Sequence, residues 1–234
     1  MRLKIRWPHS TEDMKYRCLV FDHDDTTVNS TATIHHPCFE AFLRSYFPDR
    51  SCSLEEYFEK NFSPGFVAMC RDDYGMDDEM ILKEAQYWQE YVRDKIPEVY
   101  PGIREIMETH KRRGGLIAVI SHSYRHNILR DYEANSLPAP DMVFGWEMPP
   151  EQRKPSPWPL QEVLRYFNLL PGEALMIDDL KPGYDMACAC GVPFAAAGWS
   201  NNTVSIESFM RKNSSLYFKQ VSELADYLFE DGGC

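Results

Sequence analysis

CLVFDHDDTT, residues 18–27, is the stretch of this chain that decides the fold. Four apolar residues with the character of a β-strand run directly into three acids, Asp22, Asp24 and Asp25, and two threonines follow. Buried carboxylates repel one another, so such a cluster needs a nearby cation or an exit to the surface. Open α/β sheets bind ligands at the carboxyl ends of their strands. The stretch therefore predicts a buried strand that ends at a binding site; a solvated acidic turn and a calcium loop are the alternatives.

Short apolar runs alternate with helical patterns in the second half of the chain. The runs that predict further strands are 116–120, 142–144, 174–177 and 192–196. Between them, apolar residues recur with the spacing of amphipathic helices, as in Leu160, Val163, Leu164 and Phe167. This alternation predicts an α/β fold with a doubly wound parallel sheet.

The segment between the first two strands is different, because only helical patterns occur there. After a connector at residues 28–37, three helices are expected: one that Pro48 stops, one that a capping box at Ser53–Glu56 opens, and one that carries Ile81, Ala85, Trp88 and Val92. The chain is therefore expected to divide into an α/β core, residues 1–30 and 99–234, and a helical insertion, residues 31–98.

Polar groups follow three of the expected strands: Asp22 and Asp24, Ser121, and the pair Asp178 and Asp179. Because the carboxyl ends of parallel strands share one edge of a sheet, these side chains are expected to converge. Each feature alone is ordinary, since such residues are common helix caps and turn formers. Their combination at one edge predicts an active site.

Four segments together resemble the motifs of the haloacid dehalogenase-like phosphohydrolases, in order and over nearly the whole chain. They are the Asp-x-Asp-x-Thr pattern at 22–26, Val119-Ile120-Ser121, the lysine of Arg153-Lys154-Pro155, and Ile177-Asp178-Asp179. The helical insertion resembles the cap of the phosphoglycolate phosphatase and β-phosphoglucomutase branch. The resemblance implies a Rossmann-like core under an inserted helical cap.

Catalytic roles come with this resemblance. Asp22 would attack phosphorus and form an aspartyl-phosphate, and Asp24 would act as general acid and base. Ser121 would donate to a phosphoryl oxygen, and Lys154 would neutralise charge on the transferring group. Mg²⁺ would be the cofactor, with Asp22, the backbone carbonyl of Asp24 and Asp179 as ligands and Asp178 binding directly or through water.

Further residues have weaker assignments. Thr26, His122 and His23 are expected to line the substrate site, with His23 at its edge. Lys181 is expected to pair with the acids before it, and Asp185 to brace the metal site. In the cap, the polar residues Lys60, Asn61 and Arg71 are expected to be solvated.

Composition excludes several classes of function. The formal net charge of −11 disfavours nucleic acid as a partner, and no apolar run reaches the length of about 18 residues that a membrane span needs. Met1–Pro8 lacks the apolar core of a secretory signal, and the seven cysteines have no disulfide spacing, so the cytoplasm is expected. The oligomeric state is left open.

The sequence thus predicts a Mg²⁺-dependent hydrolase of a small phosphorylated metabolite. A dehalogenase does not need an acid at the position of Asp24, which argues against that chemistry. A phosphosugar mutase would use the same residues, and a non-catalytic protein that binds a phosphorylated ligand is the non-enzymatic alternative. The identity of the metabolite is not readable from the sequence.

Overall fold

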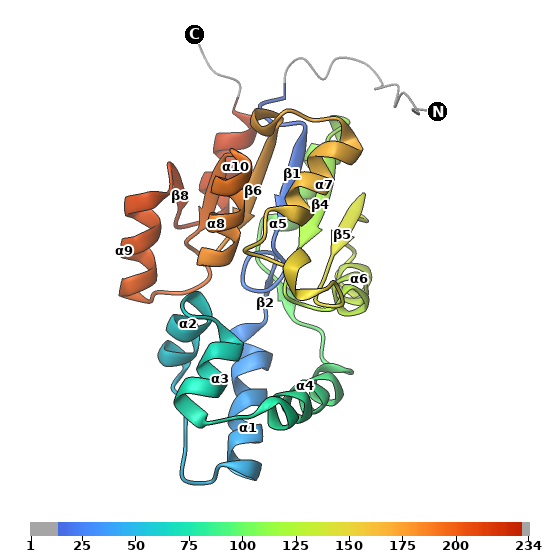
Figure 1. Cartoon of the computed structure of the whole chain (residues 1–234). Coiled ribbons are helices and arrows are strands. Elements are labelled where there is room, and N and C mark those ends of the chain that lie inside the picture. The colour runs from blue at the N-terminus through green and yellow to red at the C-terminus, as the bar shows by residue number, and fades with distance from the viewer. Residues whose placement is uncertain (1–13, 231–234) are drawn as a thin grey trace.

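A six-stranded parallel sheet forms the centre of the computed structural model, which describes residues 14–230 (Figure 1). The strand order is β5-β4-β1-β6-β7-β8. The strands are β1 Cys18–Phe21, β4 Leu116–Ile120, β5 Met142–Phe144, β6 Ala174–Asp178, β7 Phe194–Ala197 and β8 Leu216–Phe218. The predicted α/β fold with a parallel sheet is confirmed.

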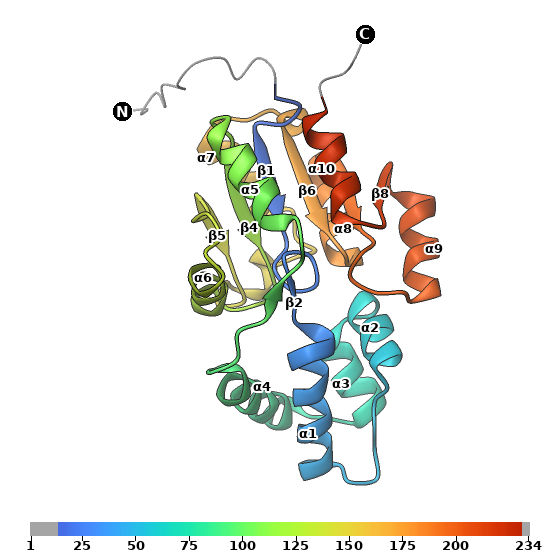
Figure 2. The ribbon, with the colours of Figure 1, turned by 180° about the vertical axis from the view of Figure 1, so that it is seen from behind.

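Alternate residues of the central strands pack against opposite helical layers. Leu19 and Phe21 contact the layer of α5 (Ile103–Arg112), α6 (Arg125–Ala134) and α10 (Val221–Phe229). Cys18 and Val20 contact the layer of α7 (Trp158–Phe167), α8 (Lys181–Cys190) and α9 (Val204–Asn213). Figures 1 and 2 show the two faces in turn. All four residues of β1 are buried because helices cover both faces.

The helices between residues 31 and 92, called the cap from here on, gather below the carboxyl edge of the sheet (Figure 1). They are a π-helix at Thr31–His35, then α1 His36–Tyr46, α2 Leu54–Phe62, α3 Phe66–Tyr74 and α4 Asp78–Val92. They have a core of their own, in which Phe39, Phe42 and Leu43 are buried. The chain enters and leaves this group through two short antiparallel strands, β2 Val28–Asn29 and β3 Glu98–Val99.

Sequence patterns missed parts of this architecture. The expected connector at residues 28–37 is wrong, because it contains β2, the π-helix and the first two residues of α1. The patterns also did not predict α3, α6 or α9. The expected capping box is confirmed: Ser53 accepts the Glu56 amide, and the Glu56 side chain accepts the Ser53 amide.

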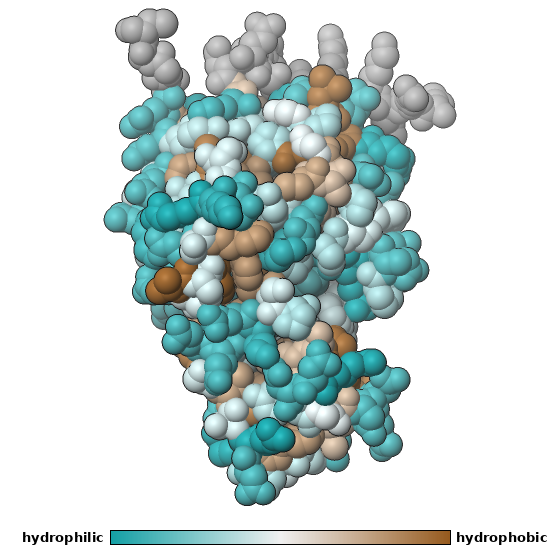
Figure 3. Space-filling model, turned by 60° about the vertical axis from the view of Figure 1, so that its left-hand side comes forward, coloured by the Kyte–Doolittle hydropathy of each residue, from teal (hydrophilic) through white to brown (hydrophobic). Residues whose placement is uncertain are grey.

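The face of the molecule in Figure 3 is mainly hydrophilic, with small hydrophobic areas between the polar residues. Within residues 14–230, no helix combines the length and the apolar character needed to cross a membrane. The expectation for Met1–Pro8 lies outside the described residues.

Candidate active site

Three neighbouring strands deliver the predicted polar residues to one edge of the sheet. Strands β4, β1 and β6 lie side by side. Asp22 follows the last residue of β1, Ser121 follows the last residue of β4, and Asp178 ends β6. The Asp22 amide still donates to the Ile177 carbonyl at 2.9 Å, so the sheet pairing continues into the site. The expected convergence is present.

Lys154 joins two of these strand ends. It lies in the loop between the 3₁₀ turn Pro150–Gln152 and α7, and its Nζ donates to Asp22 Oδ1 at 2.7 Å and to Asp178 Oδ2 at 2.6 Å. All three side chains are buried. A buried lysine that bridges two carboxylates keeps its charge: burial opposes protonation, but Asp178 and Asp22 raise the pKa of Lys154 further.

Asp22, Asp178 and Asp179 form a group whose carboxylate oxygens lie within 4.8 Å of one another, and all three residues are buried. Burial, with the negative charges of Asp178 and Asp24, raises the pKa of Asp22 to about 7 despite the charge of Lys154. Burial, Asp25 and Asp178 raise the pKa of Asp179 well above its usual range. A divalent cation would relieve this repulsion, and oxygen ligands are those that Mg²⁺ prefers. The donor set therefore fits Mg²⁺.

Neighbouring groups hold the acidic cluster in place. Thr26 donates its hydroxyl to Asp179 Oδ1 at 3.3 Å, and Thr27 donates to the Asp22 carbonyl at 2.7 Å. The Leu180 amide donates to Asp178 Oδ1 at 2.8 Å. A Cβ on Gly183 would overlap Asp178 Oδ2, so only glycine leaves room for that carboxylate.

The Asp24 side chain turns away from this cluster toward the cap. Its Oδ1 accepts hydrogen bonds from Ser30 Oγ at 2.7 Å and His35 Nε2 at 2.9 Å, and its Oδ2 accepts one from Ser123 Oγ. Burial opposes ionisation of Asp24, but His35 outweighs it and the pKa of Asp24 is lowered. Asp24 is thus held as a carboxylate in this structure.

Trp88 orients the histidine that contacts Asp24. The indole Nε1 of Trp88 donates to His35 Nδ1 at 3.0 Å. Because an indole nitrogen is only a donor, this bond places the His35 proton on Nε2, the atom that faces Asp24. Trp88 of α4 is thereby linked through His35 of the π-helix to Asp24, which follows β1.

The remaining predicted residues lie around this centre. Ser121 is buried, and its hydroxyl accepts the Ser123 amide at 3.2 Å. His122 donates Nε2 to the Lys154 carbonyl at 2.9 Å, and burial and Lys154 lower its pKa to about 4. His23 is buried and its Nε2 is 3.0 Å from Asp131 Oδ2.

One of the weaker expectations is corrected. Lys181 forms its ion pair with Asp185, one helical turn along α8, and not with Asp178 or Asp179. The expectation that Asp185 braces the metal site stays a prediction. Lys60 pairs with Asp73 and Arg71 with Asp78, at positions away from the cavity described next.

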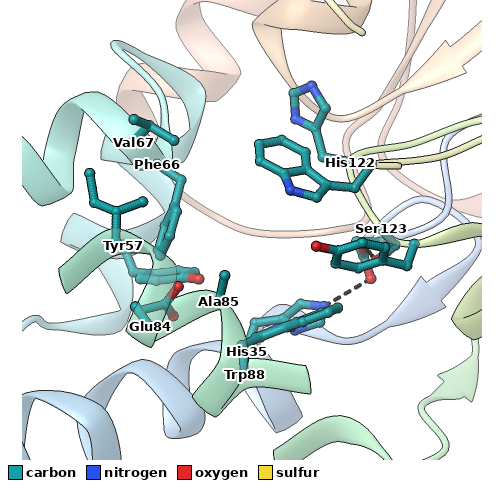
Figure 4. A pocket seen from close by; sticks show the side chains of 13 residues that line it. His35, Tyr57, Phe66, Val67, Glu84, Ala85, Trp88, His122 and Ser123 are labelled. Atoms are coloured by element: carbon teal, nitrogen blue, oxygen red, sulfur yellow. Dashed lines mark hydrogen bonds and ion pairs between the residues drawn. The ribbon is translucent and has the colours of Figure 1, made fainter. Parts of the chain in front are cut away.

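A cavity of about 180 Å³ opens between the core and the cap, beside Asp24 (Figure 4). His122, Ser123, Tyr124 and Trp146 line it from the core. Residues of the π-helix, α2, α3 and α4 line it from the cap, and they include His35, Tyr57, Phe66, Glu84 and Trp88. Its walls are mostly apolar and aromatic.

Sequence reasoning did not identify Ser30, His35, Ser123 or Glu84. A signal for Glu84 was present, since Ile81, Ala85 and Trp88 define an apolar helical stripe and Glu84 lies on the same side. An acid within such a stripe is either buried or turned into a cavity. The partners of Asp24 carried no comparable signal, because they are ordinary polar residues in two separate segments, at 30–35 and at 123.

Residues 19–197 match the haloacid dehalogenase-like hydrolase family, so the chain belongs to that family and is an enzyme of the hydrolase class. The pyrophosphatase PpaX of Bacillus cereus strain Q1 is 24% identical over 192 residues, which are 80% of this chain and 85% of that protein. The family suggested by the sequence motifs is confirmed.

Solved structures show the same fold. A predicted phosphoglycolate phosphatase from Haemophilus somnus superposes with a TM-score of 0.69 at 18% identity, covering 91% of this chain and 98% of that chain. A mutant of CbbY from Rhodobacter sphaeroides, in complex with xylulose-(1,5)bisphosphate, superposes with a TM-score of 0.67 at 18% identity, covering 89% of this chain and 96% of that chain.

Proposed function

We propose that this chain is a Mg²⁺-dependent phosphatase that hydrolyses a small phosphomonoester through an aspartyl-phosphate on Asp22. The observation that carries the proposal is the group of Asp22, Asp178, Asp179 and Lys154 at the carboxyl edge of the sheet. Such a group supplies a nucleophile, a metal site and a fixed cation, which are the parts that phosphoryl transfer needs. The phosphatase names of similar proteins support the same class of reaction.

Asp22, Asp178 and Asp179 would hold Mg²⁺ together with the backbone carbonyl of Asp24. When bound, Mg²⁺ would neutralise charge on the phosphoryl oxygens. Lys154 holds Asp22 and Asp178 at a fixed separation and supplies a second positive charge beside the transferring group.

The reaction would proceed in two displacements. A carboxylate oxygen of Asp22 forms a bond to phosphorus, the ester P–O bond breaks, and the leaving oxygen takes a proton from Asp24. Water then attacks the phosphorus of the aspartyl-phosphate and gives a proton to Asp24. The bond between phosphorus and the Asp22 oxygen breaks, so phosphate is released and Asp22 is restored. Asp24 therefore acts first as the acid and then as the base.

The first step needs a protonated Asp24, whereas the structure holds it as a carboxylate. A phosphate dianion beside Asp24 raises the pKa of that carboxyl, because like charges disfavour ionisation. His35 belongs to the π-helix at the entrance of the insertion, so a movement of the insertion would also change its bond to Asp24. We infer that residues 31–98 act as a mobile cap on a core of residues 1–30 and 99–234.

Other residues would bind the substrate. Ser121 would donate its hydroxyl to a phosphoryl oxygen, and Thr26 would hold Asp179 toward the metal. His122 lies between Lys154 and the cavity, where it can contact the leaving group. His23, bonded to Asp131, supports the loop at the edge of the site.

The partner we propose is a small phosphorylated metabolite rather than a nucleic acid, because the net charge of −11 repels a phosphate backbone. We place the protein in the cytoplasm on the basis of its cysteine usage, since seven cysteines without disulfide spacing suit a reducing compartment.

The test is phosphate release from a panel of phosphomonoesters, with Mg²⁺ and with EDTA. Wild-type enzyme should release phosphate only with Mg²⁺, Asp22→Asn should not, and the exposed Asp226→Asn control should match wild type. Conversion of sugar phosphates to isomers without phosphate release would identify a mutase. Binding without either reaction would identify a non-catalytic protein.

A further inference from the structure

The cavity next to Asp24 is the place where the leaving group of a substrate must lie. Asp24, the proposed proton donor to the leaving oxygen, is itself part of the cavity wall. A phosphoryl group at Asp22 and Lys154 would therefore direct its leaving group past Asp24 and into this space. The chemistry of the wall then decides which leaving groups fit.

Five aromatic side chains line the cavity: Tyr57, Phe66, Trp88, Tyr124 and Trp146. They come from both the cap and the core, so a group between them is enclosed from two sides (Figure 4). Aromatic faces carry partial negative charge and attract cations, most strongly where water is excluded. A cavity of about 180 Å³ suits a group of a few heavy atoms, since one of roughly 150 Å³ holds benzene.

Glu84 is the acidic side chain of the wall that the proposed reaction does not use. Only 5% of the residue is exposed, and it lines the cavity. Among residues 14–230 it has neither a hydrogen-bond partner nor an ion-pair partner. Burial raises the pKa of Glu84 to about 7, and His35 partly opposes this. A buried carboxylate without a partner is costly, and a cation in the cavity would remove that cost.

Lysine and arginine side chains are missing from this wall. None of the described lining residues belongs to either type. Arg153 lies nearby, but its guanidinium is stacked on Trp146, with Cζ 4.1 Å from the ring centroid, and its Nε donates to the Met148 carbonyl. A leaving group with a second negative charge would meet Glu84 and Asp24 without a lysine or arginine to neutralise it, and His35, which also lines this wall, is already bonded to Asp24.

We propose that the substrate is a phosphomonoester of a small amino alcohol, whose ammonium group lies among the aromatic side chains and pairs with Glu84. This inference rests on the proposed phosphatase function and names its substrate class. Such a substrate differs from pyrophosphate, phosphoglycolate and bisphosphates, because the leaving groups of those compounds are anionic. The phosphoryl end would meet Lys154 and the proposed Mg²⁺, and the ammonium end would meet Glu84 of the cap.

The test compares substrates that differ in one atom. Phosphocholine and 3,3-dimethylbutyl phosphate have the same shape, but the first carries a quaternary nitrogen where the second carries carbon. Wild-type enzyme should prefer phosphocholine in kcat/KM by at least about tenfold, as expected for one desolvated cation–aromatic contact. Phosphoethanolamine should also be cleaved better than 2-phosphoglycolate.

Two variants of α4 test the role of Glu84. Glu84→Gln should reduce the preference for phosphocholine over its neutral isostere by about tenfold or more. Glu90→Gln removes the same charge from an exposed position of the same helix and should keep the preference. A preference for the neutral isostere or for 2-phosphoglycolate, or a preference that Glu84→Gln leaves intact, would overturn the inference.

A binding measurement separates this inference from the proposed reaction. Choline alone should change the tryptophan fluorescence in a saturable way, because Trp88 and Trp146 line the cavity, and 3,3-dimethylbutanol should bind at least about tenfold more weakly. Choline binding without hydrolysis of any ester would refute the phosphatase and keep the ammonium site. Hydrolysis of p-nitrophenyl phosphate without selectivity for choline would support the phosphatase and refute the ammonium site.

Discussion

Replacing Glu84 with glutamine should change how the stability of this protein depends on pH. In the folded chain, burial raises the pKa of Glu84 from 4.5 to about 7. Below pH 4.5 the carboxyl is protonated in both the folded and the unfolded chain and has no effect. Between pH 4.5 and 7 the unfolded chain releases the proton while the folded chain keeps it, so the free energy of unfolding of the wild type falls as the pH rises.

The gap between the two pKa values sets the size of the effect. At about 1.4 kcal/mol per pH unit, the gap corresponds to about 3 kcal/mol of unfolding free energy. The wild type has lost this amount completely above pH 7. Glutamine does not titrate, so Glu84→Gln avoids this loss. Burying an amide without a partner costs about 1–3 kcal/mol, but that cost is the same at every pH. The variant should therefore gain about 3 kcal/mol relative to wild type between about pH 4.5 and about pH 8.

Urea unfolding at several pH values, followed by tryptophan fluorescence in EDTA, measures this difference. Subtracting the wild-type curve removes other titrating groups, such as His110, whose pKa burial lowers to about 4. The exposed Glu90→Gln variant is the control and should give a difference that does not vary with pH. If the difference in unfolding free energy between Glu84→Gln and the wild type does not vary with pH, Glu84 is not a buried carboxyl without a partner.

Four further outcomes are expected. Asp22→Asn should abolish turnover in a phosphate-release assay while the circular dichroism spectrum stays that of the wild type; activity within about tenfold would refute its role as nucleophile. Asp24→Asn should lose roughly 10²–10⁴-fold in kcat for alkyl phosphates but less for aryl phosphates, whose leaving groups need no proton; equal losses would contradict the acid role. Gly183→Ala should lower kcat by roughly 10²-fold, because its Cβ displaces Asp178, whereas Gly172→Ala, with open space at its Cβ, should match wild type; an active Gly183→Ala would show that Asp178 tolerates movement. Mg²⁺ should raise the Tm of the wild type and raise that of Asp22→Asn less; equal shifts would place the metal elsewhere.

The strand ends show what local sequence can determine. Asp22, Ser121 and Asp178 each follow a short apolar run, and each run is a buried parallel strand in the structure. Parallel strands must align their carboxyl ends, so three separate predictions of strand ends were enough to predict one site. Lys154 was predicted from its motif, and the structure places its Nζ between the carboxylates of Asp22 and Asp178.

Helices with weak apolar stripes were not predictable in the same way. The segment of α6, RHNILRDYEA, is mostly polar, yet Ile128 and Tyr132 are fully buried against the sheet. The segment of α3 is short, and its buried residues, Met69 and Cys70, are adjacent rather than spaced over several turns. In both helices the packing partners decide which side is buried, and those partners lie far away in the sequence.

By itself the sequence determined the sheet and the acidic cluster, because apolar periodicity and the position of a carboxylate at a strand end are local properties. The class of chemistry came from the resemblance of four local motifs to those of a known family. Tertiary structure alone decided that Ser30, His35 and Ser123 hold Asp24, and that Glu84 faces a cavity with aromatic walls. The contact of Ser123 with Asp24 spans 99 residues, and the wall of the cavity joins residues of the core and the cap. The energies of these contacts depend on burial and charge at the meeting point, and that environment exists only after the cap has folded against the core.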